Sequence, residues 1–297
     1  MGFESRGIPH LVSAIYLDNS RYKVPKSPNP LIKPILIGAS VLLLSLNFID
    51  LDINERLAYD KKEQFDPSLS RLNSIDKLEA YIDSNEVVCK TTPNTVDYVV
   101  VISQAIRNRF YHGFSHFTLK ENWIAALSEK FVGYGLSCKV KPNDIMEQPF
   151  AACSQQAMVM MEILKRKHLT YRSVGFPHHF ALEVLINDKW YYFDPNMEPN
   201  MTADQRLEDN WKCCADNLKR YYDTSRFHDL DWKFGKNLTV THSAINASYA
   251  ANARVFQSTT NVLSKIAWCF PLIILGYRTR RAKKEEAKNQ SEFKGWI

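Results

Sequence analysis

Two long apolar runs stand near the ends of a chain that is otherwise mixed in polarity. Residues 31–49 carry a single charge, Lys33, close to one edge of the run. Nineteen helical residues extend about 28 Å, close to the ~30 Å hydrocarbon core of a bilayer. The second run, residues 261–277, contains Lys265 and Pro271. The pattern predicts two transmembrane helices, over 31–49 and 261–277.

Each run also has a simpler interpretation. The first is compatible with a buried core helix, or with the apolar part of a cleaved signal peptide. No small-residue cleavage site follows it before Asp50, which favours an uncleaved anchor. The second is compatible with an amphipathic helix lying on a membrane surface. The basic cluster that begins at Arg278 favours a second span with a cytoplasmic end.

The net charge of +6 is concentrated in the two tails. Residues 1–33 carry a net +3 and residues 278–297 a net +4, which leaves −1 for the residues between them. This almost neutral middle argues against a nucleic-acid partner. If the two runs span a membrane, the basic tails predict that both termini are cytoplasmic and that the middle lies on the periplasmic or extracellular side of the cytoplasmic (inner) membrane. Membrane lipid is therefore an expected partner, through the two predicted spans.

The hydrophobic pattern divides the chain into seven segments. They are a cytoplasmic basic tail (1–30), a transmembrane helix (31–49), a helical connector (50–95), the main domain (96–235), a membrane-proximal segment (236–260), a second transmembrane helix (261–277) and a second cytoplasmic basic tail (278–297). In the connector, Ile75, Leu78 and Ile82 form one helical stripe.

The main domain begins with helical patterns and continues with strands. Residues 96–110 predict a mostly buried helix, and residues 119–134 predict an amphipathic one. Residues 154–167 predict a third helix, with Cys153 at its start, and residues 170–176 predict a strand.

A hairpin follows over residues 179–194, with a two-residue turn at Asn187-Asp188. In that register, paired residue numbers sum to 375, so Phe180, Leu182 and Val184 share a face with Tyr191 and Phe193. His179, Ala181 and Glu183 share the other face with Trp190, Tyr192 and Asp194. His179 and Asp194 are then diagonal neighbours, about 7–8 Å apart along the backbone, and their side chains can meet.

Cys153 is the candidate nucleophile. A helix N-terminus and a nearby imidazolium both lower the pKa of a thiol, and the first-turn N–H groups point at a developing oxyanion. His179 would act as base and then as acid, while Asp194 fixes its tautomer. The neighbouring His178 is expected on the apolar face by alternation. The alternative is that Cys153 is a small buried hydrophobe, as most free cysteines are.

The order of these motifs resembles the transglutaminase-like superfamily of papain-related thiol enzymes. Cys153 followed by Ala157, the strand that begins His179-Phe-Ala-Leu-Glu183, and the strand Lys189-Trp190 that ends in Asp194-Pro195 carry the resemblance. It covers about a third of the chain, and it implies an α+β fold in which the helix bearing the cysteine packs on an antiparallel sheet. Ala151 and Ala181 depart from the small glycine and the aromatic residue that this family commonly has there.

Further side chains complete the candidate site. Gln148, five residues before Cys153, is a candidate oxyanion donor, with a solvated loop residue as the alternative. Glu183 is expected to support the site rather than to exchange protons. His112 and His116 are expected to be solvated or at the lip of the cleft, with a position lining the cleft as the alternative. No C-x-x-C or H-E-x-x-H spacing is present, so we expect neither a metal nor another cofactor.

The resemblance implies acyl transfer at an amide through a thioester on Cys153. Water would complete a hydrolysis, and an amine would complete a cross-link, so the expected substrate is a peptide or a protein. A rival hypothesis of another class is a catalytically idle scaffold or binding component of an export or polysaccharide-assembly system in the cell envelope. An envelope protein complex is the partner that this rival expects.

Overall fold

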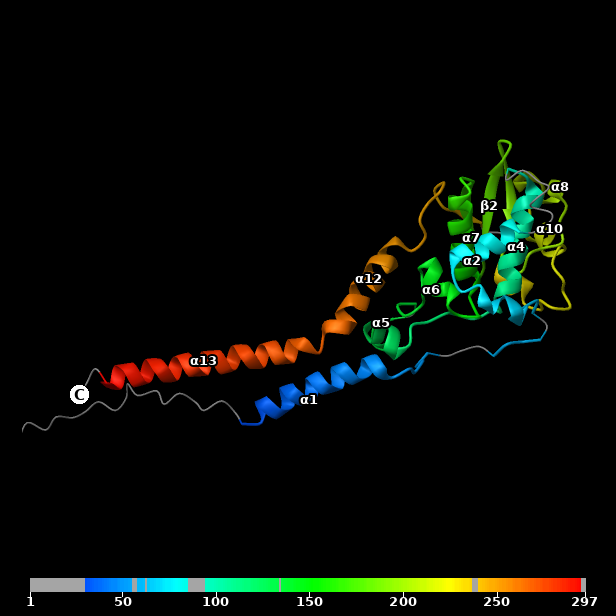
Figure 1. Ribbon diagram of the computed structural model, residues 1–297. Coiled ribbons are helices and arrows are strands. Elements are labelled where there is room, and N and C mark those ends of the chain that lie inside the picture. Colours follow the sequence, from blue (N-terminus) through cyan, green and yellow to red (C-terminus); the bar gives the residue numbers. More distant parts are fainter. Residues whose placement is uncertain are drawn as a thin grey trace, which may run out of the picture. The chain divides into compact units, whose positions relative to one another are not determined.

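The computed structural model describes residues 30–54, 58–61, 63–84, 94–133, 135–236 and 240–294. Their contacts divide into two units, one comprising the residues up to Ser40 together with those from Pro271 onward, and the other Val41–Phe270. The elements are labelled in Figure 1. They are the helices α1 (Ile32–Ser45), α2 (Ile75–Asp83), α4 (Val96–Arg109), α5 (Leu119–Phe131), α6 (Pro142–Met146), α7 (Cys153–Arg166), α8 (Ala203–Arg206), α9 (Glu208–Trp211), α10 (Ala215–Lys219), α11 (Leu230–Phe234), α12 (Ala251–Ile266) and α13 (Cys269–Lys294), the 3₁₀ turns η2 (Leu46–Phe48) and η3 (Pro67–Arg71), and the strands β1 (Thr170–Gly175), β2 (Phe180–Ile186), β3 (Lys189–Phe193) and β4 (Thr241–His242).

The centre of the larger unit is a four-stranded antiparallel sheet in the order β3-β2-β1-β4. Leu182 pairs with Phe193 and Ile186 with Lys189, so the predicted register is confirmed. Asn187 and Asp188 have φ values of 49° and 61°. Two successive positive φ angles are typical of the type I′ turn, whose twist matches that of the flanking strands. The turn and the pairing of the hairpin therefore follow from its sequence.

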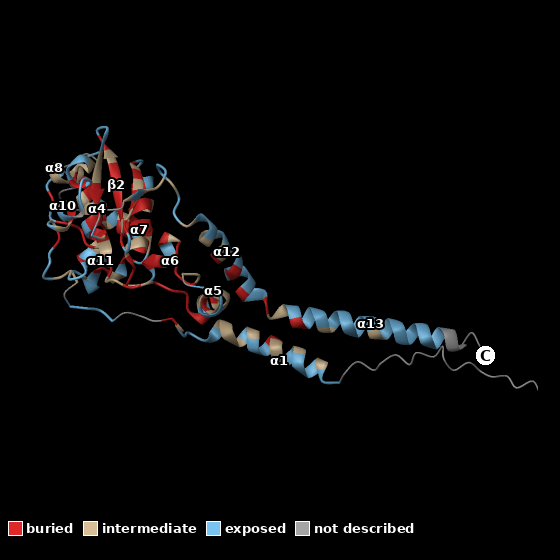
Figure 2. Ribbon diagram, turned by 180° about the vertical axis from the view of Figure 1, so that it is seen from behind, coloured by how far each residue is buried: buried red, intermediate tan, exposed pale blue. Residues whose placement is uncertain are grey.

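One face of the sheet carries the main hydrophobic core. Phe180, Leu182 and Val184 pack there with apolar side chains of α2, α4 and α7. Figure 2 shows buried residues concentrated in α4, α7 and β2. α4 begins where the Thr95 side chain accepts a hydrogen bond from the Tyr98 N–H, which satisfies one of the free donors of the first turn. The helices predicted over 96–110, 119–134 and 154–167 correspond to α4, α5 and α7.

The segment predicted as a connector contributes to this core. The stripe residues Ile75, Leu78 and Ile82 of α2 are fully buried and belong to the same cluster as the helix that begins at Cys153. The folded body therefore begins well before residue 96. The cause is visible in the sequence, because three apolar residues on one helix face are stable only against another apolar surface.

A second, aromatic core covers the opposite face of the sheet. Ala181 of β2 and Tyr192 of β3 pack there with Trp211, Phe234 and residues of the short helices between α8 and α11. The two faces thus divide the hairpin side chains as the alternation predicts. Among the short helices of this layer, α9 contributes Trp211 and α11 contributes Phe234, so single large rings supply much of its apolar surface.

α12 docks on α5 and on the segment that follows α5 through polar contacts. The Asn122 amide donates to the Thr260 hydroxyl at 2.9 Å, the Trp123 indole donates to the Ser264 carbonyl at 2.9 Å, and the Gln257 amide donates to the Cys138 carbonyl at 2.6 Å. The second span predicted over 261–277 therefore begins inside a helix that is packed on the larger unit. The segment predicted as membrane-proximal, 236–260, also contributes the edge strand β4.

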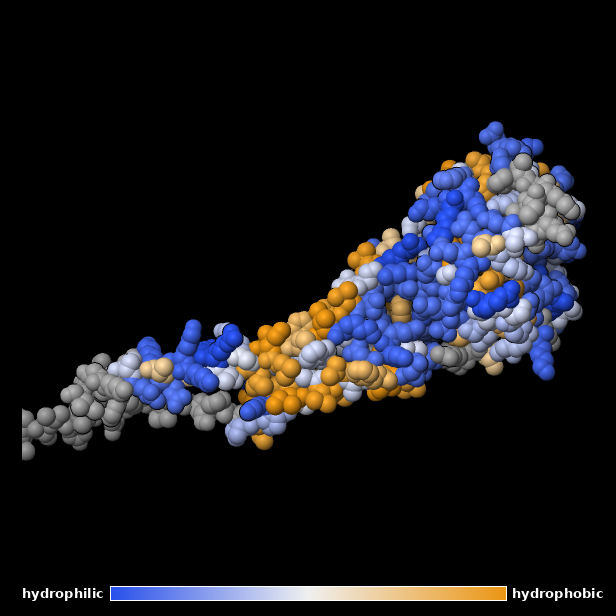
Figure 3. Space-filling view, viewed as in Figure 1, coloured by the Kyte–Doolittle hydropathy of each residue, from blue (hydrophilic) through white to orange (hydrophobic). Residues whose placement is uncertain are grey.

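In the described residues, no single helix has both the length and the apolar composition to cross a membrane. The pair formed by α12 and the part of α13 up to Ser291 passes that test together, with a bend of 55° at the break between them, and Ile32–Phe48 is a shorter apolar helix. Figure 3 shows hydrophobic residues over α1 and the first part of α13, and hydrophilic residues farther along α13. The two-span arrangement remains a prediction, and its N-terminal tail lies almost entirely outside the described residues.

Candidate active site

Cys153 is the first residue of α7 and is half-buried. The loop before it is fixed by Gln155, whose side-chain oxygen accepts hydrogen bonds from the N–H groups of Ala152 at 3.1 Å and Ser115 at 2.8 Å. The amide nitrogen of Gln155 donates to the carbonyls of Ser115 at 2.9 Å and Lys139 at 2.8 Å. All the polar groups of this side chain are therefore used to hold the start of the helix in place.

His179 lies directly before β2 and is buried. Its Nε2 is 2.7 Å from Oδ2 of Asp194, which is the contact that the hairpin register predicts. The ring stacks on Phe176 and meets Phe234 edge-on, so its orientation is fixed on several sides. Because Nε2 faces the carboxylate, Nδ1 is the nitrogen left to face the thiol of Cys153.

Asp194 is completely buried and fully hydrogen-bonded. Its Oδ1 accepts from the N–H groups of Asn196 and Met197, each at 3.1 Å. Its Oδ2 accepts from the Tyr222 hydroxyl at 2.9 Å, in addition to facing His179. A buried carboxylate with this many donors remains ionised, because the donors replace the water that it loses.

The electrostatics of the three groups are coupled. Burial acts to raise the pKa of the Cys153 thiol, but its hydrogen bond with His179 and the charge of that ring outweigh burial, so the pKa is lowered from its usual 9.0. Burial acts to lower the pKa of His179, but the charge of Asp194 and the hydrogen bonds to Asp194 and Cys153 raise it to about 10. A thiolate next to an imidazolium is the combination that these two shifts favour.

Tyr222 is a site residue that the sequence did not reveal. Its hydroxyl contacts both Asp194 at 2.9 Å and the Tyr192 hydroxyl at 2.8 Å, and it is buried. Burial and the charge of Asp194 raise the pKa of Tyr222 well above its usual value, so it donates to the carboxylate at neutral pH. It lies in a stretch of short helices without a motif, so no pattern in the sequence points to it.

The two histidines expected at the lip of the cleft are not solvated. His116 is buried, and His112 is half-buried, with its Nδ1 3.4 Å from the Asn196 amide nitrogen. Burial and the charges of Lys233 and His179 lower the pKa of His112 to about 4, so it is neutral at pH 7. His112 and Asn196 line a cavity of about 150 Å³, so this cavity lies beside the turn that follows Asp194.

His178 does not follow the alternation assumed for it. The strand begins only at Phe180, and His178 is exposed with its ring stacked on Trp232 at 4.0 Å between centroids. The prediction that it faces the apolar side is therefore wrong, because period-2 alternation applies only within the strand.

Gln148, the candidate oxyanion donor, lies at a hollow of its own. Gln148 lines a hollow with Thr118 and Lys265, and neither Cys153 nor His179 is among the described residues that line it. Its role as an oxyanion donor remains a prediction. The N–H of Ser154, which hydrogen-bonds to the Cys153 side chain, already supplies one donor at the sulfur.

The contacts of Glu183 lie within the sheet rather than on His179 or Asp194. It is fully buried, and its Oε2 is 2.7 Å from both Nε and Nη2 of Arg172 and 3.2 Å from Nε2 of His242. Burial raises the pKa of Glu183 to about 7 in spite of the Arg172 charge. Arg172 also binds Glu208 at 2.7 Å, so the group joins β1, β2, β4 and α9.

The fold and the site together define an α+β protein in which a helix-start cysteine lies beside a buried His–Asp pair. No family model matches the sequence, and no curated protein matches it. A solved structure described as "Crystal structure of a TGase" matches with a TM-score of 0.29 and 18% identity. The match covers 43% of this chain and 31% of that chain, so this chain spans about a third of the length of its neighbour. The likeness is weak, and no conclusion about this chain is drawn from it.

Proposed function

We propose that the chain is a membrane-anchored, transglutaminase-like cysteine hydrolase or acyltransferase that acts on amide bonds of peptide-like substrates. The observation that carries this proposal is the His179–Asp194 contact at 2.7 Å beside Cys153, at the start of α7, whose thiol pKa is lowered. A buried structural His–Asp pair would not by itself place a thiol at the remaining nitrogen of the ring.

The arrangement supports a two-step reaction, in which Cys153 is first acylated and then deacylated. The Cys153 thiolate attacks the amide carbonyl carbon, and the carbonyl electron pair moves onto oxygen next to the N–H groups of the first turn of α7. When the tetrahedral intermediate collapses, the C–N bond breaks and the His179 imidazolium gives its proton to the leaving amine. A thioester remains on Cys153. Water or a second amine then attacks it, His179 accepts the proton of the nucleophile, and the thiolate leaves.

The proposal includes an anchor in the cytoplasmic membrane, with the active site outside and both termini inside. Exposed apolar side chains such as Ile35, Val41 and Ile273 support it, as does the basic cluster beginning at Arg278. Membrane lipid and a peptide or protein substrate are the proposed partners. A protease-protection assay on sealed vesicles would test it, with cleavage of residues 50–260 from outside as the expected result and their protection as the contrary one.

Selective alkylation tests the proposed nucleophile. The protein is treated with iodoacetamide at mildly acidic pH, and the modified cysteines are quantified by mass spectrometry. Cys153 should react faster than Cys213, although Cys213 is exposed and Cys153 is only half-buried. A Cys153→Ala variant should lose the rapid phase, and a matched Cys213→Ala variant should keep it. A rate for Cys153 at or below that of Cys213 contradicts the proposed nucleophile.

A substrate assay then separates the enzyme from the idle envelope scaffold. A peptide mixture is incubated with the protein in the presence and absence of a fluorescent primary amine. Release of a free amine indicates hydrolysis, and incorporation of the label indicates acyl transfer. Both signals should vanish in Cys153→Ala and persist in Cys213→Ala. An idle scaffold predicts no signal in any variant and rapid alkylation in none.

A further inference from the structure

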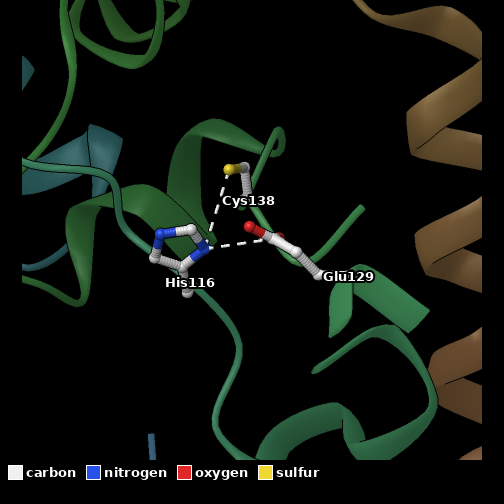
Figure 4. A group of neighbouring side chains, drawn as sticks. All are labelled: His116, Glu129 and Cys138. Atoms are coloured by element: carbon white, nitrogen blue, oxygen red, sulfur yellow. Dashed lines mark hydrogen bonds and ion pairs between the residues drawn. The ribbon is translucent and has the colours of Figure 1, made fainter. Parts of the chain in front are cut away.

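A second group of chemically capable side chains lies outside the triad. His116 and Cys138 are partners in an isolated antiparallel bridge, so their side chains lie next to each other. Glu129 comes from the last turn of α5. Figure 4 shows the three side chains pointing toward one another. An imidazole, a carboxylate and a thiol are the ligand types that zinc takes in proteins.

The distances in this group match those of a metal site. Tetrahedral zinc with Zn–N near 2.0–2.1 Å and Zn–S near 2.3 Å places the nitrogen and sulfur about 3.6 Å apart. The Cys138 sulfur is 3.6 Å from Nδ1 of His116. Oε2 of Glu129 is 3.7 Å from the same nitrogen, where ideal geometry gives about 3.4 Å. All three ligand atoms lie within 4.8 Å of one another, so one ion can reach each of them.

The surroundings orient the ligands. His116 and Cys138 are buried, and the Glu129 side chain is 11% accessible. The N–H of Ser137 donates to Oε2 of Glu129 at 2.9 Å, while the Ser137 hydroxyl contacts both that oxygen and Nδ1 of His116. The amide of Asn54 in turn donates to this hydroxyl at 3.1 Å. Such outer contacts hold ligands in position, and the serine oxygen is close enough to reach the fourth coordination position after a small shift.

The other cluster of this kind in the described residues is less suited to a cation. Glu183, Glu208 and His242 also have ligand atoms within 4.8 Å of one another. However, the Arg172 guanidinium already binds both carboxylates at 2.7 Å. A metal there would have to displace the positive charge of Arg172. Among the described residues, no Lys or Arg forms an ion pair with Glu129.

We propose that His116, Glu129 and Cys138 bind a structural Zn²⁺ ion, with water or the Ser137 hydroxyl as the fourth ligand. On binding, the metal takes the lone pairs of Nδ1, Sγ and Oε2, and the thiol proton is released to solvent. The ion would link the end of α5 to the bridged segments around His116 and Cys138. Neither a redox step nor a second reactant is needed.

This zinc site would act on the start of α7 through one side chain. Gln155, which holds the loop before Cys153, bonds to Ser115 and Lys139, the immediate neighbours of His116 and Cys138. A metal that fixes the two bridged segments therefore also fixes the acceptors and donors of Gln155. Its expected consequence is a positioning effect on the helix start, without contact with substrate.

Metal content of the full chain tests the proposal. The protein is purified in detergent without chelators, in the Cys153→Ala background so that the catalytic thiol cannot bind metal. We expect close to one zinc per chain by elemental analysis. Cobalt exchange should give a thiolate-to-cobalt charge-transfer band in the near ultraviolet. Substituting His116→Ala or Cys138→Ala should weaken metal binding by more than the ~10–100-fold seen when outer contacts are removed.

The matched control is Cys213→Ala in the same background, which removes an exposed thiol and should keep both the zinc and the cobalt band. Circular dichroism identifies variants that do not fold, and Glu129→Gln, which keeps the shape of the side chain, provides an alternative to a misfolded variant. Equal zinc content in Cys138→Ala and Cys213→Ala, or a cobalt complex without a thiolate band, would overturn the proposal. Because Cys153 is absent throughout, these outcomes are independent of the proposed function.

Discussion

Replacing Asp194 by Asn tests the electrostatic argument for the site most directly. The substitution keeps the shape of the side chain and removes its charge, which is the main group that stabilises a protonated His179. Burial acts to lower the pKa of His179, but the charge of Asp194 and the hydrogen bonds to Asp194 and Cys153 together raise it from its usual 6.5 to about 10. That shift corresponds to about 5 kcal/mol in favour of the imidazolium. Without the carboxylate, burial alone would favour the neutral ring.

The consequence should be measurable at the thiol. A neutral His179 no longer stabilises the thiolate, so the pKa of Cys153 should rise, because burial then outweighs the loss of the Asp194 charge, which itself raises this pKa in the wild type. Each unit of increase lowers the thiolate fraction at acidic pH about tenfold. The assay is the rate of iodoacetamide labelling of Cys153 from pH ~5 to ~10, a range that spans the relevant titrations. We expect the midpoint of the profile to move upward.

Stability should change in a pH-dependent way in the same variant. A raised folded-state pKa stabilises the fold when the group is protonated, so the contribution of His179 is complete below pH 6.5 and is lost as pH rises to about 10. Urea denaturation of the wild type should therefore show falling stability over that window, and Asp194→Asn should show a smaller fall. Asp223→Asn, at an exposed carboxylate next to Tyr222, is the control. An unchanged labelling profile in Asp194→Asn would refute the reasoning.

Three further substitutions test the hydrogen bonding of Asp194, the packing of α2 and the hairpin turn. Tyr222→Phe removes one hydrogen bond to Asp194 at a cost of about 1 kcal/mol, so labelling of Cys153 at acidic pH should slow about fivefold, and an unaltered rate would contradict its role. Leu78→Ala should lower the unfolding free energy in urea by about 2–5 kcal/mol, whereas a peripheral α2 would give much less. Asp188→Gly relieves a positive φ of 61° and should raise thermal stability by up to about 1 kcal/mol, with a lowered melting temperature as the contrary result.

The hairpin and its charged pair could be predicted because the information is local. Alternation fixes which side chains share a face, and Asn187-Asp188 fixes the turn, so the register of His179 and Asp194 follows without knowledge of the rest of the chain. The start of α7 at Cys153 is equally local. The role of these residues in catalysis remains a prediction.

The parts that the sequence did not reveal are those held by polar contacts. α12 contacts α5 through Thr260 and Ser264, and the segment after α5 through Gln257; the side chains of all three are buried although they carry no apolar signal. A hydropathy pattern therefore assigns the second half of this helix to the following apolar run. Tyr222 and His112 reach the site from segments without periodicity. Hydrogen-bonded burial depends on partners distant in sequence, and no local pattern encodes them.

The three residues of the proposed triad differ in burial, and that difference bears on the proposed function. Asp194 and His179 are buried and fixed by at least four neighbours, whereas the Cys153 side chain is half-buried. A purely structural cluster gains nothing from a half-buried cysteine, because the exposed part of the residue adds no packing energy and a reachable thiol is open to oxidation. A nucleophile requires an acid–base pair that does not move and a reactive atom that a substrate can reach. The distribution of burial across these three residues is the one that the proposed function requires.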